Sequence, residues 1–202
     1  MQRFLRICAN CGQFGGVIGL ISALLTTLSA CQPASETTAA VVPEAAPAAE
    51  ISYQCGADGF LETRLFGGLD LELNWRASDL NCEGMPRPDG DGARLRFAGD
   101  ASDGRRIAFI IALPDMQRGA AGAELKSTVT VIEEGQGRFF STADAEVCWT
   151  DITNVAFVAD SDAIFSVSGN LYCVAPLAQI NGDSDVLIPD LKFRGLLDWN
   201  AS

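Results

Sequence analysis

The feature that most constrains the fold is a strict alternation of apolar and polar residues over 69–76 (LDLELNWR). The run ends with the apolar Trp75 and the charged Arg76. A repeat of two places every second side chain on the same face, as a half-buried β-strand requires. Gly67 and Gly68 separate this run from a second strand-like run over 62–66. Two glycines between two such runs are typical of a β-hairpin, so this region predicts an antiparallel pair.

Further strand-like runs follow along the rest of the chain. They are 93–98, 107–113, 127–132, 137–141, 155–159, 163–174 and 185–197. The run over 107–113 is apolar on both faces, which indicates a central strand, and Pro189 suggests a bend or an edge in the last run. Turns rich in Gly, Asp, Asn and Pro separate the runs, and the helical signal is limited to one short turn within 113–125. We therefore expect an all-β fold, an antiparallel β-sandwich or a jelly-roll-like barrel.

The amino-terminal segment has the three regions of an export signal. A short basic start is followed by an uncharged apolar run over 14–28, and then by Leu28-Ser29-Ala30-Cys31. The apolar run is about 15 residues long, whereas a bilayer-spanning helix needs about 20. The four-residue motif in this position resembles the lipobox of bacterial lipoproteins. An ordinary cleaved signal and an uncleaved anchor helix are the alternatives.

The resemblance implies a defined maturation pathway. Residues 1–30 would be removed as a signal peptide, and Cys31 would carry a diacylglyceryl group on its sulfur and a further acyl chain, such as palmitate, on its amino group. Such acyl chains anchor a protein stably in a membrane. Gln32 at the next position implies sorting to the outer membrane. The CxxC pair Cys8 and Cys11 lies within the discarded segment, so we assign it no function.

A tether and one folded domain follow the lipobox. Residues 31–50 are rich in Ala, Pro, Thr and Glu and show no apolar periodicity, so they predict a flexible tether with ends about 25 Å apart. Residues 51–202 are long enough to bury one core. We expect them to form the β-sandwich domain, held away from the membrane by the tether.

Four cysteines remain in the expected domain. In an exported protein an even number of cysteines predicts disulfides, and four allow three connectivities. We favour Cys55–Cys82 and Cys148–Cys173 because each pair closes a compact local unit. A zinc site is the alternative, but the four cysteines include no closely spaced CxC or CxxC pair.

Composition limits the chemistry that the chain can perform. The chain contains no histidine, which excludes Ser-His-Asp, Cys-His and histidine-based metal chemistry. Without the segment that carries Arg3 and Arg6, 12 basic and 26 acidic residues remain, a net charge of −14. Such a charge repels nucleic acid and anionic lipid, so neither is an expected partner.

Two groups of residues are candidates for ligand binding. In three turns, residues with side-chain oxygen atoms alternate at a spacing of two, which suggests calcium binding. Asp and Gly also dominate ordinary turns, so simple turns are the alternative. The residues are Asp89 and Asp91; Asp160 and Asp162; and Asn181, Asp183 and Asp185. Five aromatic residues could form a sugar-stacking platform: Tyr53, Trp75, Trp149, Tyr172 and Trp199. We expect Trp75 to be in the core, Trp149 to pack on a disulfide, and Trp199 to be the most accessible.

The charged residues give weaker signals. Glycoside hydrolysis needs two carboxyl groups about 5–10 Å apart, and 26 acidic residues make some such pair inevitable. Glu133-Glu134 reads as a polar strand end. The arginines at 87, 94, 96, 105 and 106 read as a solvated face, with Arg94 and Arg96 able to pair with acidic neighbours.

These observations predict a non-enzymatic, lipid-anchored and disulfide-bonded domain at the outer membrane, facing the periplasm or the cell surface. Its expected role is binding or structural, with a protein, a glycan or another envelope component as the partner. The alternative function is a carboxylate-dependent glycan hydrolase. No cofactor is expected apart from calcium in one of the aspartate-rich turns.

Overall fold

The computed structural model describes residues 55–89, 91–144, 146–158 and 161–201. This part of the chain contains twelve β-strands and one short 3₁₀ turn, η1 (Ala77–Asp79). The strands are β1 (Phe60–Gly67), β2 (Leu71–Arg76), β3 (Leu80–Pro86), β4 (Ala93–Asp100), β5 (Arg106–Leu113), β6 (Gly122–Glu134), β7 (Arg138–Ser141), β8 (Cys148–Phe157), β9 (Ile164–Cys173), β10 (Leu177–Gln179), β11 (Asp185–Leu187) and β12 (Leu191–Asp198). The predicted all-β class is confirmed.

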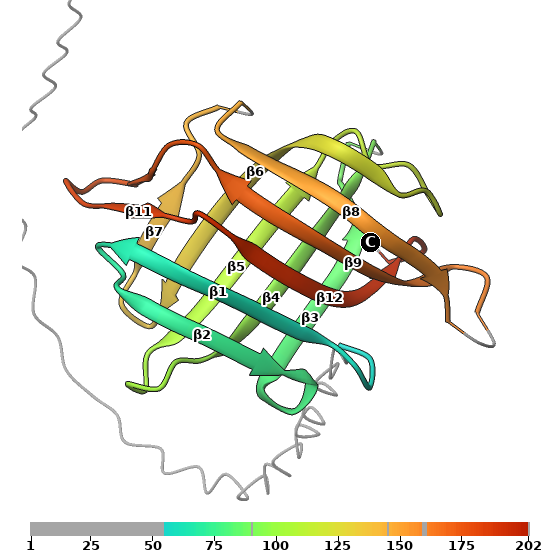
Figure 1. The fold of residues 1–202 in the computed structure, drawn as a ribbon, viewed down its shortest axis with the longest axis horizontal. Coiled ribbons are helices and arrows are strands. Elements are labelled where there is room, and N and C mark those ends of the chain that lie inside the picture. The colour runs from blue at the N-terminus through green and yellow to red at the C-terminus, as the bar shows by residue number, and fades with distance from the viewer. Residues whose placement is uncertain (1–54, 90, 145, 159–160, 202) are drawn as a thin grey trace, which may run out of the picture. The chain divides into compact units, whose positions relative to one another are not determined.

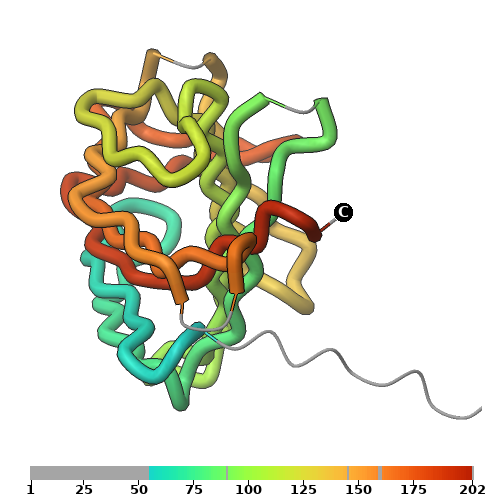
Figure 2. Tube along the Cα trace, turned by 90° about the vertical axis from the view of Figure 1, so that its right-hand side faces the viewer, coloured from blue at the N-terminus to red at the C-terminus, as the bar shows by residue number. Residues whose placement is uncertain are grey.

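The strands form two antiparallel sheets. Sheet A has the order β2-β1-β12-β9-β8 and ends on the first part of β6. Sheet B has the order β3-β4-β5-β6-β7-β10-β11 and ends on the last residues of β1. Strands β1 and β6 therefore belong to both sheets. Figure 1 shows β1, β12 and β9 crossing in front of β3, β4 and β5, and the perpendicular view separates the two layers (Figure 2).

The core lies between the sheets and follows from the alternation in the strands. In β2 the burial of successive residues alternates without exception, as the sequence predicted. Aromatic pairs join the two layers. The ring centroids of Phe97 on β4 and Phe193 on β12 are 5.4 Å apart, and those of Trp75 on β2 and Phe109 on β5 are 6.2 Å apart. Burial of each such ring stabilises the fold by about 2–3 kcal/mol. The layers are thus held together mainly by apolar packing.

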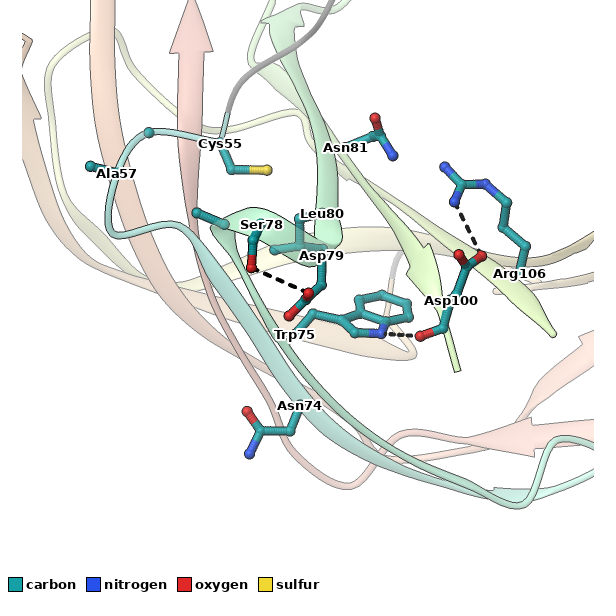
Figure 3. A pocket seen from close by; sticks show the side chains of 12 residues that line it. Cys55, Ala57, Asn74, Trp75, Ser78, Asp79, Leu80, Asn81, Asp100 and Arg106 are labelled. Atoms are coloured by element: carbon teal, nitrogen blue, oxygen red, sulfur yellow. Dashed lines mark hydrogen bonds and ion pairs between the residues drawn. The ribbon is translucent and has the colours of Figure 1, made fainter. Parts of the chain in front are cut away.

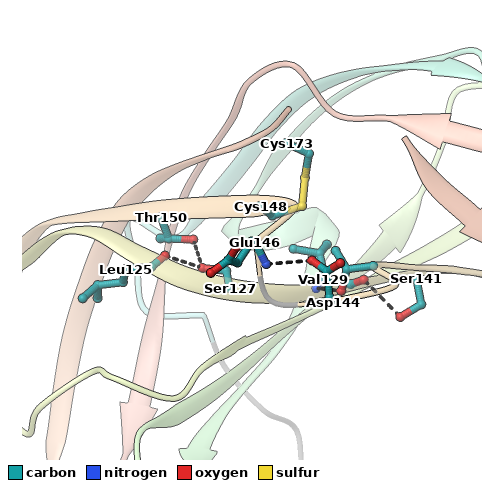
Figure 4. The surroundings of a disulfide bond; sticks show 10 residues. Leu125, Ser127, Val129, Ser141, Asp144, Glu146, Cys148, Thr150 and Cys173 are labelled. Carbon is teal, nitrogen blue, oxygen red and sulfur yellow. Dashed lines mark hydrogen bonds between the residues drawn. A yellow bond between two sulfur atoms is a disulfide. The ribbon is translucent and has the colours of Figure 1, made fainter. Parts of the chain in front are cut away.

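Both predicted disulfides are present. Cys55, just before β1, is bonded to Cys82 on β3, and this bond links the start of sheet A to an edge strand of sheet B. Cys148 and Cys173 are directly opposite each other on β8 and β9, with their Cα atoms 4.0 Å apart (Figure 4). Beside the second bond, the buried hydroxyls of Ser127 and Thr150 lie 2.7 Å apart and join β6 to β8.

The structure departs from the expected elements in five places. Strands β3 and β10 were not predicted, and β8 begins at Cys148, well before the expected run over 155–159. The run over 185–197 is two strands, β11 and β12, because the chain bends at Pro189 as expected. The helical turn expected within 113–125 is wrong: β5 ends at Leu113, and the chain makes non-helical turns before β6. Among the described residues no helix has the length and apolar character to cross a membrane.

Candidate functional site

The chain changes sheets at a tight corner between β2 and β3. Strand β2 ends at Arg76, the turn η1 follows, and β3 begins at Leu80 in the other sheet. The Asp79 carboxylate accepts a hydrogen bond from the backbone N–H of Arg76 at 3.2 Å. The hydroxyl of Ser78 donates to the same carboxylate at 3.2 Å. These local bonds are typical of Ser and Asp in turns, and they hold both polar side chains at the surface of the corner.

The side chain of Trp75 supports the corner from the core. It is buried, and its indole Nε1 donates a hydrogen bond to the backbone carbonyl of Asp100 at 2.8 Å. Gly99 makes this close approach possible. A Cβ atom at position 99 would lie 2.8 Å from both the Asp79 carbonyl and the indole ring, so only glycine fits without displacing them. The corner is therefore set by packing and is not a loose loop.

A cavity of about 990 Å³ opens at this corner. We call it the corner cavity. Its polar lining comes from Asn74 on β2, Ser78 and Asp79 on η1, Asn81 on β3, Asp100 on β4 and Arg106 on β5, and the disulfide residue Cys55 completes one wall (Figure 3). Six polar residues from five neighbouring elements thus line one hollow.

Ion pairs hold the cationic side of the corner cavity in place. Arg106 lies 3.2 Å from the Asp100 carboxylate and 3.0 Å from Glu134 on β6. Arg96 lies 2.6 Å from the same Glu134 and extends the network to β4. Arg106 is therefore locally neutralised, whereas Asp79 has hydrogen bonds but no cationic partner among the described residues.

The lining of the corner cavity suits a ligand rich in hydroxyl groups. The amides of Asn74 and Asn81 can each donate and accept, the carboxylates of Asp79 and Asp100 accept, and the Arg106 guanidinium donates. The first four of these side chains are exposed and available to a ligand. In small-molecule sites, precisely placed polar groups of this kind fix the orientation of the ligand. In a chain without histidine, the acid groups of the cavity are the carboxyls of Asp79 and Asp100.

The structure does not bring the calcium candidates together. Asp89 and Asp91 lie between β3 and β4, where Asp89 forms an ion pair with Arg87 at 2.6 Å. Asp183 lies in the turn before β11, and Asp185 is the first residue of that strand. Asp162 is exposed, and Asp160 lies outside the described residues. Within the described ranges, no three His, Cys, Asp or Glu side chains gather in a metal-binding arrangement. Calcium stays a prediction, which a lower melting temperature in the presence of a chelator would support.

The aromatic candidates have three different environments. Trp75 is in the core, as predicted. Trp149 does not point toward the disulfide as expected: Cys148 faces inward, while Trp149 faces outward and pairs across the strands with Tyr172, which is 37% exposed. The expectation that Trp199 is the most accessible is also wrong, because it packs partly buried against the core with its Nε1 atom buried.

The charged residues of sheet B are paired more extensively than expected. Arg96 forms ion pairs with Glu83 and Glu134, where a solvated face was expected, whereas Arg94 contacts the Met85 sulfur at 3.2 Å. Glu133 is not simply a polar strand end. It is buried, with its carboxylate 2.8 Å from Arg138 and 3.8 Å from Arg105.

Sequence reasoning did not single out the side chains that converge on the corner cavity. Asn74, Asp79, Asn81 and Asp100 looked like ordinary strand or turn residues, because their meeting depends on the pairing of β3 with β4 and on the corner at η1. The serine and aspartate between two strand-like runs were the one local signal. Cys8, Cys11, Cys31 and Tyr53 lie outside the described residues.

Comparison with protein-family models, curated proteins and solved structures finds no match to this chain.

Proposed function

We propose that this protein is a lipid-anchored protein of the bacterial cell envelope that binds a glycan without cleaving it. The observation that carries the proposal is the corner cavity, a hollow of about 990 Å³ whose lining residues carry amide, carboxylate, hydroxyl and guanidinium groups. These groups form directional hydrogen bonds with hydroxyl groups and so give a polyhydroxylated ligand its orientation.

The anchor and the charge of the chain support an envelope role. Acyl chains on Cys31 and the tether over 31–50 would hold the domain close to the membrane while leaving it free to reach neighbouring polymers. The net charge of −14 that remains without Arg3 and Arg6 of the leader disfavours nucleic acid and strongly anionic polymers as ligands. An uncharged or weakly charged glycan is compatible with both features.

The test is binding of the full-length chain, purified in detergent, to glycans. The probes are linear oligosaccharides of glucose, N-acetylglucosamine, xylose and mannose, measured by calorimetry, together with purified peptidoglycan sacculi measured by co-sedimentation. We expect at least one probe to bind. Asn81→Ala should weaken that binding about tenfold, since it removes an exposed hydrogen-bonding group from the cavity. Asn200→Ala, which removes an exposed amide outside the cavity, is the matched control.

Two results would overturn the proposal. The first is that no oligosaccharide binds and the sacculi do not sediment the protein. The second is that binding occurs but Asn81→Ala and Asn200→Ala both leave it unchanged.

Glycan hydrolysis is the second candidate function, because the carboxylates of Asp79 and Asp100 line the same cavity. A glycosidase needs such a pair, one as acid and the other as base or nucleophile. Release of reducing ends from any bound oligosaccharide, lost in both Asp79→Asn and Asp100→Asn while each variant remains folded, would favour the hydrolase. Binding without product release favours the binding protein.

A further inference from the structure

A second hollow lies on the outer face of sheet A and adjoins the corner cavity. It has a volume of about 270 Å³, and residues of β1, β2 and β12 line it, among them Glu62, Arg64 and Lys192. Asn74 lines both this hollow and the corner cavity, so the two are continuous at that side chain. The binding surface at the corner therefore continues across the strands of sheet A.

A row of polar side chains follows the same direction. Successive strand pairs place Asn74 opposite Glu62, Glu62 opposite Lys192, Lys192 opposite Asn170, and Asn170 opposite Asp151. Because neighbouring strands lie about 4.8 Å apart, the row from β2 to β8 spans about 19 Å. Figure 1 shows these five strands side by side at the front of the domain. The row offers amide, carboxylate and ammonium groups along one line.

An aromatic pair lies at the far end of this row. Trp149 on β8 and Tyr172 on β9 are directly opposite each other, and each is two residues from a member of the row, Asp151 or Asn170. Tyr172 is 37% exposed. On the inner face of sheet A, the Cys148–Cys173 disulfide joins β8 and β9 (Figure 4). The two strands that carry the aromatic pair are therefore covalently linked.

Charge on this face is mixed and largely neutralised in place. Arg76 pairs with Glu62 at 2.7 Å, Arg64 with Asp70 at 2.6 Å, and Lys126 with Glu146 at 2.7 Å. The Lys126 ammonium also lies 6.0 Å from the Trp149 ring, within the range of a cation–π contact. A surface with paired charges, aromatic faces and hydrogen-bonding side chains fits an uncharged polyhydroxylated chain better than a polyanion.

From this placement we infer that the outer face of sheet A is an extended binding surface for a linear, uncharged glycan, which runs from the corner cavity to Trp149 and Tyr172. The inference rests on the proposed function and adds the length and direction of its ligand. The polar row bonds sugar hydroxyls, and the aromatic pair offers apolar ring surface to the carbon–hydrogen face of a sugar at the far end.

The test is a length series of whichever oligosaccharide binds the full-length chain, from one to six sugars. Affinity should rise with length until the aromatic pair is reached. Tyr172→Ala and Trp149→Ala should weaken binding of the hexamer about tenfold and leave binding of the dimer unchanged. Asn81→Ala should weaken both. Phe139→Ala is the matched control, since Phe139 is similarly exposed, at 40%, but lies on β7 of sheet B.

The outcomes separate the two proposals. If no glycan binds, the proposed function fails and the extended surface fails with it. If glycans bind with an affinity that does not depend on length, and Tyr172→Ala and Trp149→Ala have no effect on the hexamer, the corner cavity stands and the extended surface is wrong. The extended surface is also wrong if either aromatic variant weakens dimer and hexamer equally. Unchanged far-ultraviolet circular dichroism and an unchanged urea unfolding transition, together with Tyr172→Phe that keeps hexamer binding, exclude misfolding as the cause of a loss.

Discussion

The guanidinium of Arg138 lies 2.8 Å from the carboxylate of Glu133, whose side chain is only 6% exposed. Arg138 also donates a 3.3 Å hydrogen bond to the carbonyl of Gly68, in the turn between β1 and β2. Arg105 approaches the same carboxylate at 3.8 Å from the other side. A buried charge at the end of β6 is thus neutralised by two arginines, one of which also fixes the β1–β2 hairpin.

This arrangement predicts unequal effects when either partner is removed. Arg138→Leu leaves a buried carboxylate without its close cation and should lower the free energy of unfolding by about 3 kcal/mol. Glu133→Gln should lower it by only about 1 kcal/mol, because the arginines left behind are about 30% exposed and can be hydrated. Urea unfolding of both variants measures the difference, and equal losses would contradict this account.

The close packing under the corner cavity predicts that Gly99→Ala is harmful. The added methyl group would lie 2.8 Å from the Trp75 ring and from the Asp79 carbonyl. Such overpacking should cost about 1–3 kcal/mol. It should also shift the NMR signal of the Trp75 indole N–H, which bonds the Asp100 carbonyl.

Gly104→Ala is the control for this effect. A Cβ atom at position 104 meets nothing within 4 Å, but the residue has a positive φ of +83°. This variant should therefore lose about 1–2 kcal/mol through backbone strain alone. An unchanged Trp75 indole signal in Gly99→Ala, or a shift of the same size in Gly104→Ala, would show that the corner is not packed as described.

The contrast between predicted and observed strands has a physical basis. The run over 69–76 was predictable because one face is buried and the other is exposed at every position of β2. Strand β3 was not, because its sequence LNCEGMP contains Gly84 and Pro86, and only its first three residues alternate between buried and exposed. Its pairing with β4 along its whole length makes it a strand. Local pattern therefore predicts strands with one solvated face and misses those defined by a partner.

The candidate site was less predictable than the fold for the same reason. The disulfide pairs could be inferred from their spacing along the chain, since each closes a local unit. Asn74 and Asp100 meet at the corner cavity only because β2 and β4 belong to different sheets that come together at η1. The alternating strand-like runs and the turns between them predicted the all-β class, and the absence of histidine excluded histidine chemistry. No sequence pattern specifies where two sheets meet.

The loop between β4 and β5 contains a carboxylate with an altered pKa. Hydrogen bonds from the side chain and the backbone N–H of Arg105 lower the pKa of Asp103 below its ordinary value. A carboxylate with a lowered pKa in the folded state stabilises the fold above its unfolded pKa, and this contribution is lost as pH falls through the folded pKa. Arg105→Gln should therefore raise the pKa of Asp103 toward its ordinary value, as measured by NMR titration of the carboxyl carbon. An unchanged titration would show that Arg105 is not the cause.

The proposed lipid anchor predicts a specific effect of one cysteine. Cys31→Ala removes the sulfur that would be acylated if Leu28-Ser29-Ala30-Cys31 acts as a lipobox. In a bacterial host fed an alkyne-bearing fatty acid, the original protein should be labelled and found with the membranes, whereas Cys31→Ala should carry no label. Cys11→Ala is the matched control and should be labelled as strongly as the original, because Cys11 lies in the segment that the resemblance expects to be removed. Labelling that persists in Cys31→Ala, or that disappears in Cys11→Ala, would contradict anchoring at Cys31. Loss of the label in Cys31→Ala alone would support an exported domain held near its glycan by acyl chains, since two or more such chains are needed for a stable anchor.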